Sequence, residues 1–521
     1  MIPTTRFSRN LGWILLLDAA LLLPVLGRSM LSRIDEAQIA EVSREMVTGR
    51  DWVTPRIGAI PFAAYPPFHY WLLAASGSIF GFTEFAMRLP TALASLALLA
   101  VLAVLTRRLA GDDAGIAAAL ILATTPAFFL QSTVCRADVL TMLFATAAFD
   151  RFLAWTEPAE RGGRKNRDLA LMYLFTALGI LTKGPLTVAV LGLGGLAWFL
   201  VRREWTLLIG MKFWYGIPAA LLIVIPWYYA VYHLNGWAFV RENLLLENVN
   251  AYTEGYQQKR PWTFYLRQTP LLTPWLFSLT LTRTVRRAPG VALSLVWAGL
   301  VFLFLELSSA KRINYLTYLT APLAMAAATM LTALWRDKPA LARRCLLGFG
   351  CAVAAGGAVL ALIPASVWTG ASLLKIATRI PWIGGVSAGA ALGVVLMTAR
   401  FGFCAGFAGM TGALATAFFV YGAFVNPRLN LDTREMAEGC RRLATRIPAG
   451  ETLYVPAEGG AEGFYHFYVG RTLPSREGEP GLYLASELQE RKFRKDGKPL
   501  EIIDRMLDHQ GRDRYLLRII P

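Results

Sequence analysis

The sequence predicts an all-α polytopic membrane protein that ends in a small soluble α/β domain. Of its 521 residues, 55% are hydrophobic and only 17% are charged, whereas about a quarter of the residues of a soluble protein are charged. The apolar residues fall in long blocks and not in short periodic stripes, and uncharged blocks of about 20 residues are membrane helices by length. These blocks stop near residue 425. We therefore expect a transmembrane domain over 1–425 and a soluble domain over 426–521.

The uncharged blocks predict about 13 membrane helices. They lie at residues 11–30, 85–108, 114–131, 136–155, 168–182, 184–201, 213–232, 265–282, 290–308, 312–335, 343–366, 381–400 and 404–425. The first follows a basic start and no A-x-A cleavage site comes after it, so we expect a retained anchor. Residues 66–82 are also apolar, but their Pro-Pro start and aromatic run favour an interfacial helix.

The distribution of basic residues predicts the orientation of the chain. Arginine and lysine are dense in alternate loops, at 107–108, 151–167, 202–203, 283–287 and 336–344. Cytoplasmic loops carry such an excess, so the loop at 31–84 and the C-terminal domain are expected outside the cytoplasm. The polar, aromatic stretch 233–262 would then be an outside loop, either a mobile lid over the substrate or an ordinary surface loop.

The charge and the cysteines exclude other classes of protein. The formal charge is +17, but the basic residues form no continuous patch or nucleic-acid motif, so anionic headgroups and phosphate-bearing substrates are the expected partners. The five cysteines show no CxxC pair and are expected to be small buried hydrophobes. No GxxxxGK[ST] or GxGxxG signature supports ATP-driven or NAD-linked chemistry.

After residue 426 the chain takes on the pattern of a soluble α/β domain. Asp432 and Glu435 have the spacing of a capping box before an amphipathic helix. Strand-like runs follow at 452–455, 464–469, 481–484 and 515–520. No catalytic motif is visible in this domain.

The loop after the first anchor is unusually acidic and begins with Asp35 and Glu36. The apolar spacing of Ile39, Val42 and Met46 predicts an amphipathic helix on the membrane surface. Carboxylates are favoured at a helix N-terminus, so these two acids either begin that helix or perform chemistry. The local pattern leaves both interpretations open.

Four motifs in this order resemble one family of enzymes. They are DEAQIAEVSREMVTGRDWVTPRIGAIPF…YPPFHYWL from residue 35, CRAD at 135–138, LTKGP at 181–185 and SSAKRINYLTYLTAPLA at 308–324. Together they are similar to the polyprenyl-phosphate-sugar glycosyltransferases of the GT-C fold, in the aminoarabinose transferase (ArnT-like) and protein mannosyltransferase group. The resemblance covers the whole membrane part and implies that loop 31–84 carries the active site.

The resemblance also implies roles for individual residues. Asp35 matches the essential acid and candidate general base, and Lys183 matches the lysine that faces the donor phosphate. Where close relatives keep an arginine and a lysine, this chain has Gln38 and Tyr65, and Ala64 stands in place of an acid. The expected catalytic residues are Asp35, Glu36 and Asp138; the expected substrate-binding residues are Arg136, Lys183, Arg260, Lys311, Arg312, Gln38, Tyr65 and His69.

These features lead to one function and two alternatives. A phosphate leaving group needs cations, and an acceptor hydroxyl needs a base, so we expect an inverting hexosyl- or pentosyltransferase with a polyprenyl-phosphate donor such as undecaprenyl phosphate. The expected acceptor is lipid A, another cell-envelope glycolipid, a glycan or a protein hydroxyl, at the bacterial inner membrane. A polyprenyl-lipid transporter or flippase, or a lipid-binding scaffold, would also be apolar, but no internal repeat is visible and only Asp18 lies in the middle of a span.

No cofactor is implied by any motif. The chain has four histidines without a metal-binding spacing, so a histidine-built metal site is not expected. Asp35 and Glu36 have oxygens that suit a divalent ion, which leaves a metal as the lesser alternative.

Overall fold

The computed structural model describes most of the chain. Its description omits residues 1–4, 33–34, 59, 158–162, 255–259, 269–271, 273–274, 276–289, 363–379, 427–430, 448–450, 456–461, 472, 474–478, 508–512 and 521. The expected span at 265–282 falls largely on these residues and so lies outside the described part.

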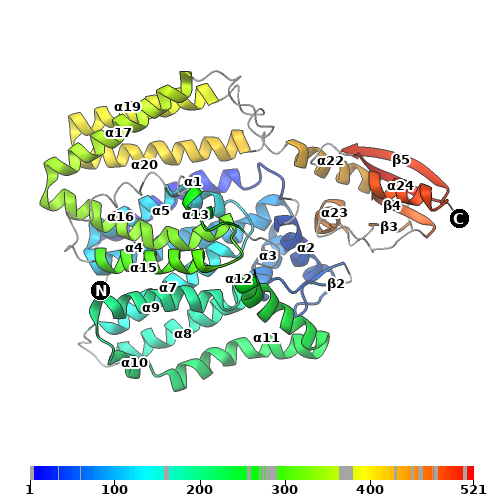
Figure 1. Ribbon diagram of the computed structural model, residues 1–521, viewed down its shortest axis with the longest axis horizontal. Coiled ribbons are helices and arrows are strands. Elements are labelled where there is room, and N and C mark those ends of the chain that lie inside the picture. Colours follow the sequence, from blue (N-terminus) through cyan, green and yellow to red (C-terminus); the bar gives the residue numbers. More distant parts are fainter. Residues whose placement is uncertain are drawn as a thin grey trace.

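The membrane part is a bundle of long helices joined by short surface elements (Figure 1). Its longer helices are α1 (Thr5–Leu22), α4 (Glu84–Ala110), α5 (Asp112–Ala123), α7 (Asp138–Thr156), α8 (Gly163–Lys183), α9 (Leu186–Arg202), α11 (Phe213–Arg241), α15 (Val291–Leu307), α16 (Thr317–Asp337), α17 (Pro339–Leu362), α19 (Ile380–Phe401) and α20 (Phe403–Val420). Among the described residues, six helices are long and apolar enough to cross a membrane, or seven if one bent pair counts as a single span. The polytopic helical architecture is confirmed, while the total of about 13 spans stays a prediction.

Shorter elements lie between these helices. They are η1 (Leu23–Val25), α2 (Asp35–Thr48), β1 (Arg56–Ile57), β2 (Ile60–Pro61), α3 (Phe68–Phe80), α6 (Pro126–Ser132), α10 (Leu207–Gly210), η2 (Glu242–Asn250), α12 (Ala251–Glu254), α13 (Phe264–Arg267), η5 (Ile313–Leu316) and η7 (Tyr421–Val425). The 13 residues of α3 are too few to span a bilayer, as expected for an interfacial helix.

Burial separates the central helices of the bundle from those at its edge. In α16, 89% of the most apolar stretch is buried inside the molecule. In α11, only 22% is buried. Small side chains such as Ala321, Ala324 and Ala328 let α16 approach its neighbours closely. On α11, exposed side chains such as Trp214, Leu222 and Tyr229 are apolar, as expected for a helix that faces lipid.

Two predicted segments differ in the structure, while the predicted break at Lys183 is observed. The expected span at 114–131 is bent by 67° between α5 and α6, because Pro126 has no N–H to continue the helix. The expected outside loop at 233–262 begins as helix: α11 runs to Arg241 with a kink at Gly236, which has φ 75°, and η2 continues it. The break between α8 and α9 follows Lys183 directly, where Gly184 adopts φ +70°.

The C-terminal unit forms the end of the molecule away from the N-terminus (Figure 1). It contains α22 (Leu431–Arg446), β3 (Leu453–Tyr454), α23 (Glu462–Val469), β4 (Gly481–Ser486), α24 (Glu487–Lys495), β5 (Leu500–Leu507) and β6 (Asp513–Ile519). The strands form one sheet in the order β3-β4-β6-β5, in which β3 pairs parallel to β4 and the other pairs are antiparallel. The expected capping box at 432–435 involves side chains outside the described part.

The strand expected at 464–469 is wrong, because these residues form the helix α23. Their aromatic composition favours a strand, but burial on several sides of a short helix overrides that preference. Phe464, Tyr465 and Tyr468 are all buried, in one core that also contains Ile39 and Val42 of α2. The edge strand β5 was not expected, because a bulge between Ile502 and Asp504 breaks the alternation of apolar and polar residues.

We predict that a methyl group on Gly115 of α5 destabilises the bundle. A Cβ there would lie 2.5 Å from the backbone oxygen of Ala103 on α4, and a backbone atom cannot yield without moving its helix. Gly115→Ala should cost about 1–3 kcal/mol and lower the apparent Tm in detergent. The control is Gly299→Ala on α15, where a Cβ meets nothing within 4 Å. Equal melting temperatures for the two variants would contradict this account of the α4–α5 contact.

Candidate active site

Asp35 is the first residue of α2, at the positive end of the helix dipole. Its Oδ2 accepts a hydrogen bond from Nη2 of Arg136, in an ion pair between residues 101 positions apart. The Asp35 side chain is 45% exposed. Asp35 and Arg136 both line a cavity of about 300 Å³ with Ser32 and Gln131. This carboxylate is thus held in place and yet accessible to a ligand.

The neighbouring Glu36, unlike Asp35, is closed off from solvent. It is buried, and its two oxygens accept hydrogen bonds of 2.9 Å from Nε and Nη2 of Arg88 on α4. The backbone N–H groups of Ser32 and Cys135 donate to the same carboxylate at 2.9 Å. Burial by itself raises the pKa of Glu36, but the charge and hydrogen bonds of Arg88 outweigh it and lower the pKa. All of these bonds hold the chain together, and none leaves an oxygen free for a substrate proton.

Arg88 also binds the segment that leads from the first membrane helix to Asp35. Its Nη1 donates to the carbonyls of Leu26 at 2.7 Å and Ser29 at 2.6 Å, and its Nη2 donates to Met30 at 2.9 Å. Carbonyls near the end of a helix lack partners within it. A buried guanidinium that also binds Glu36 therefore fixes the start of α2 against α4.

The second acid, Asp138, lies at the start of α7 and forms a closed cluster. Its Oδ1 accepts from Lys183 Nζ at 2.5 Å and from the hydroxyl of Tyr318 at 2.9 Å, while its Oδ2 accepts from Asn314 Nδ2 at 2.9 Å. Asp138 and Lys183 are both buried. A buried charge is tolerated when it is paired and hydrogen-bonded. The cluster therefore holds the Lys183 ammonium at the junction of α8 and α9.

Three tyrosine rings surround the ammonium of Lys183. Its Nζ lies 5.2 Å from the ring centroid of Tyr315, 5.5 Å from that of Tyr65 and 5.9 Å from that of Tyr318, all within cation–π range. Burial raises the pKa of Tyr65 to about 12, so its hydroxyl stays protonated at neutral pH. Lys183, Tyr65 and Tyr315 line a small cavity together with Arg312, which brings a second cation to the same place.

The CRAD segment connects these two parts of the site. Arg136 faces Asp35 in the larger cavity, and Asp138, two residues later, holds Lys183 beside the smaller one. An accessible carboxylate is thus separated by one short segment from a pair of cations. This arrangement suits a base on one side and an anionic group on the other.

The remaining expected site residues lie elsewhere. Lys311 is buried and its Nζ donates to the carbonyls of Glu306 at 2.5 Å and Ser308 at 2.6 Å, which places its charge at the C-terminal end of α15. Arg260 is exposed and lies 5.9 Å from the ring of Phe264. No described contact joins either cation to Asp35, Asp138 or Lys183.

Gln38 and His69 are packed against other parts of the chain. A Cβ on Gly463 of α23 would lie 2.8 Å from the Cα of Gln38, so this part of α2 is covered by the C-terminal unit. His69 is buried with Nε2 3.4 Å from the carbonyl oxygen of Cys135. Burial lowers the pKa of His69 to about 4, so the ring is neutral at physiological pH.

Sequence reasoning missed Arg88, Asn314 and Tyr318. A signal for Arg88 was present, since an arginine within the block 85–108 needs a partner in the membrane part. Asn314 and Tyr318 stand in the motif from which the two basic residues were chosen, four positions apart and hence on one helical face.

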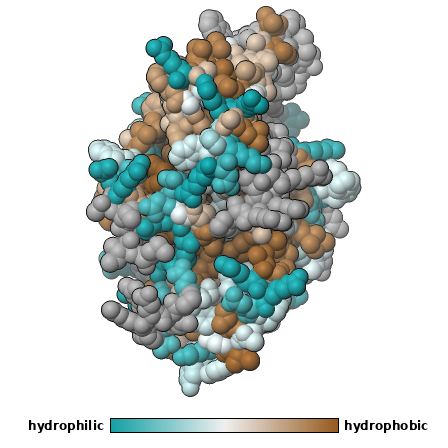
Figure 2. Space-filling view, turned by 90° about the vertical axis from the view of Figure 1, so that its left-hand side faces the viewer, coloured by the Kyte–Doolittle hydropathy of each residue, from teal (hydrophilic) through white to brown (hydrophobic). Residues whose placement is uncertain are grey.

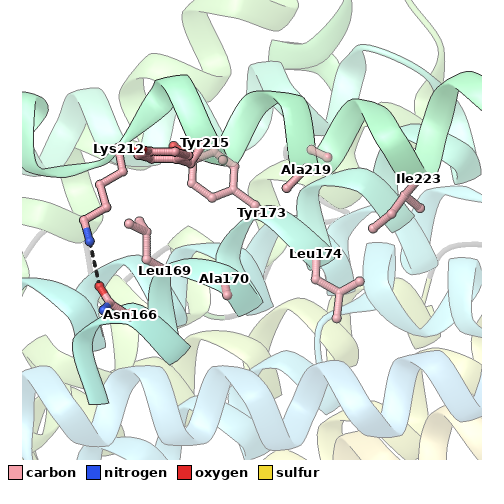
Figure 3. A pocket seen from close by; sticks show the side chains of 11 residues that line it. Asn166, Leu169, Ala170, Tyr173, Leu174, Lys212, Tyr215, Ala219 and Ile223 are labelled. Carbon is pink, nitrogen blue, oxygen red and sulfur yellow. Dashed lines mark hydrogen bonds between the residues drawn. The ribbon is translucent and has the colours of Figure 1, made fainter. Parts of the chain in front are cut away.

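A larger cavity of about 340 Å³ lies far from these acids (Figure 3). Tyr173 and Leu174 of α8 line it together with Ala219 of α11, and Lys212 Nζ donates to Asn166 Oδ1 at 3.0 Å. Asn166 precedes Lys183 by 17 residues on α8, which is about 25 Å along the helix. No acid is among the described residues that line this cavity, so it does not combine a carboxylate with cations as the site around Asp35 does.

Parts of the chain are similar in sequence to known transferases. Residues 64–229, less than half of the chain, match the family model described as dolichyl-phosphate-mannose-protein mannosyltransferase. The undecaprenyl phosphate-alpha-4-amino-4-deoxy-L-arabinose arabinosyl transferase of Pseudomonas paraeruginosa is 31% identical over 60% of this chain and 57% of its own length. That of Pseudomonas aeruginosa is 32% identical over 61% and 59%. The chain thus spans less than two thirds of the curated relatives it matches.

Solved structures extend the likeness over the whole chain. ArnT from Cupriavidus metallidurans bound to undecaprenyl phosphate superimposes with a TM-score of 0.83, at 21% identity, over 97% of this chain and 98% of that one. The oligosaccharyltransferase of Archaeoglobus fulgidus with a tethered acceptor peptide gives a TM-score of 0.54, at 15% identity, over 95% and 69%. The expected ArnT-like GT-C fold is confirmed.

We predict that Glu36→Gln strongly destabilises the protein. The change leaves the buried charge of Arg88 without its counter-ion, which costs about 3–5 kcal/mol. Thermal unfolding in detergent should show a large fall in the apparent Tm. The matched control is Glu438→Gln on α22, whose ion pair with Arg434 at 2.8 Å is solvent-exposed; it should change stability by no more than about 1 kcal/mol. A small effect of Glu36→Gln would show that this ion pair does not stabilise the fold.

Proposed function

We propose, on the premise that this chain has the GT-C fold of the ArnT structures, that it is an integral membrane glycosyltransferase. It would move a sugar from a polyprenyl-phosphate donor to a hydroxyl acceptor. The observation that carries the proposal is the half-exposed carboxylate of Asp35, which lies across the CRAD segment from the cations Lys183 and Arg312. A transporter needs no such accessible acid at a helix N-terminus beside paired cations.

In the proposed reaction the acceptor hydroxyl attacks the anomeric carbon of the donor sugar. The bond from that carbon to the phosphate oxygen breaks, and the polyprenyl phosphate leaves with its electron pair and charge. Asp35 takes the acceptor proton, and Lys183 and Arg312 stabilise the phosphate. A single direct displacement inverts the anomeric configuration. Asp138 holds Lys183 in place for this purpose, and an arginine stays charged at physiological pH.

The other expected residues receive positioning roles in this proposal. Glu36 has both oxygens bound to Arg88 and to backbone N–H groups, so it places Asp35 instead of reacting. Lys311 stabilises the end of α15. Tyr65 stands where close relatives keep a lysine, and it offers an aromatic face to Lys183 at 5.5 Å instead of a third charge.

The proposed donor is an undecaprenyl-phosphate-linked pentose or hexose, and the proposed acceptor is lipid A or another cell-envelope glycolipid. The names of the two Pseudomonas relatives support the donor, since they specify an undecaprenyl-phosphate-linked aminoarabinose. The glycan and protein-hydroxyl acceptors stay open, because the mannosyltransferase model also matches part of the chain.

We propose that the end of the bundle with Asp35 and the C-terminal sheet faces away from the cytoplasm. The opposite end carries Arg108, Arg202 and Arg336 in the last turns of membrane helices. Hydrophilic side chains are spread over that end among apolar ones (Figure 2). An excess of basic residues marks the cytoplasmic side.

Asp35→Asn should abolish transfer while the protein stays folded. The amide cannot take the proton from the acceptor hydroxyl. In the presence of lipid A, the rate at which an undecaprenyl-phosphate sugar releases undecaprenyl phosphate should therefore fall at least about 100-fold. The control is Asp51→Asn in the same loop, because the side-chain oxygen of an asparagine can still accept from the N–H groups of Val53 and Thr54 at 3.0 Å. Turnover by Asp35→Asn at the rate of the control would refute Asp35 as the base.

The adjacent cations Lys311 and Arg312 should respond differently to substitution. Arg312→Met removes a charge that lines the proposed phosphate cavity, and the affinity for undecaprenyl phosphate should fall about tenfold or more. Lys311→Met removes bonds to two carbonyls, so the apparent Tm should fall with little change in affinity. Native mass spectrometry and thermal unfolding measure the two effects. The opposite pattern would move the phosphate site to Lys311.

A further inference from the structure

A second group of ionisable side chains lies where α2 meets the C-terminal unit. Glu41 and Glu45 are one helical turn apart on α2 and so share a face. His466 of α23 faces both, with Nδ1 3.8 Å from Oε1 of Glu41 and 3.8 Å from Oε1 of Glu45. The side chains are 4%, 0% and 10% exposed for His466, Glu41 and Glu45. One ligand atom from each residue lies within 4.8 Å of the others.

The histidine is aimed into this cluster without a hydrogen bond. Its Nδ1 is buried and has no hydrogen-bond partner among the described residues, and 3.8 Å is too long for a hydrogen bond to either carboxylate. A buried polar atom without a partner is costly and calls for an explanation. Each separation is about twice a metal–ligand bond of about 2.0–2.2 Å. A cation between the groups would contact the imidazole and both acids.

The surroundings hold the carboxylates and leave an excess of negative charge. Arg44 donates to Glu41 through Nε at 2.8 Å and Nη2 at 2.6 Å. The backbone N–H of Gly58 donates to Oε1 of Glu45 at 2.7 Å. One guanidinium faces two acids. Such second-shell bonds orient ligands for a metal, and a dication would supply the missing positive charge.

The backbone leaves room for the imidazole. Gly58 has φ +65°, and a Cβ there would lie 3.3 Å from Cε1 of His466. A larger residue at this position would be strained and would crowd the ring.

We propose that Glu41, Glu45 and His466 form a binding site for a transition-metal dication. Two carboxylate oxygens and one imidazole nitrogen suit Zn²⁺, with water in the fourth position. Zn²⁺ also ranks high in affinity among the divalent first-row metals. The four histidines of the sequence gave no hint of this site, because His466 is more than 400 positions away from the two acids.

The site would fasten the C-terminal unit to the helix that begins with Asp35. Two further contacts already join these parts: the hydroxyl of Tyr468 accepts from the Leu31 N–H at 2.8 Å, and Arg44 Nη1 lies 3.4 Å from the carbonyl of Gly470. A metal bound by both α2 and α23 adds to these contacts only when the two are docked. Metal binding should therefore stabilise the docked arrangement.

The test uses the full chain in detergent, purified without a polyhistidine tag and freed of metal with a chelator. Wild type should bind one equivalent of Zn²⁺ by elemental analysis after desalting, and its apparent Tm should rise by about 4 °C or more. His466→Gln should lower the Zn²⁺ affinity at least about tenfold and lose the Tm rise. The matched control is His233→Gln on α11, an exposed histidine, which should bind as wild type does.

Two further measurements test the proposal even if the His466 variant does not fold. Co²⁺ bound to wild type should give visible d–d absorption that Zn²⁺ displaces, and Glu45→Gln should weaken that signal. Wild type without a bound equivalent, or equal binding by wild type and the His466 or Glu45 variant, would overturn the proposal. Neither readout depends on sugar transfer, so failure here leaves the proposed enzymatic activity to be judged separately.

Discussion

The buried ion pair between Glu36 and Arg88 is the interaction on which the rest of the site depends. Removing two charges from water is costly unless their hydrogen bonds are satisfied, and here the backbone supplies the remaining partners. Glu36 also accepts from the N–H of Cys135, and Arg88 donates to three carbonyls before α2. One pair therefore joins the end of the first membrane helix, α2, α4 and the CRAD segment. The position of Asp35 follows from this junction.

Neighbouring acids acquire different properties from their surroundings. Asp35 keeps almost half of its surface in contact with solvent and has one arginine partner. Glu36 and Asp138 are enclosed, and their oxygens are occupied by fixed donors. An acid that must take up a proton needs access, whereas an acid that holds a cation needs complete hydrogen bonding. The fold separates these two tasks within a few residues.

The C-terminal unit takes part in this organisation even though it carries no recognisable catalytic motif. Its helix α23 packs its aromatic side chains into one core with α2, so its docking and the placement of Asp35 are coupled through a single helix. This coupling gives the small sheet domain a physical role, because it covers part of α2. The buried cluster of Glu41, Glu45 and His466 lies in that same contact.

The sequence by itself determined the helical membrane architecture and the small C-terminal region with a sheet, because hydropathy, charge and helix-start patterns are local properties. Short motifs also singled out Lys183 and Arg312, which line one cavity in the structure; their role in binding stays a prediction. Tertiary structure alone decided that Lys311 turns away from Arg312, that Arg88 holds Glu36, and that residues 464–469 form a helix against α2. The physical reason is that partners and burial depend on contacts between distant segments. The sequence gives the charge of a side chain, but the free energy of burying that charge depends on the groups around it.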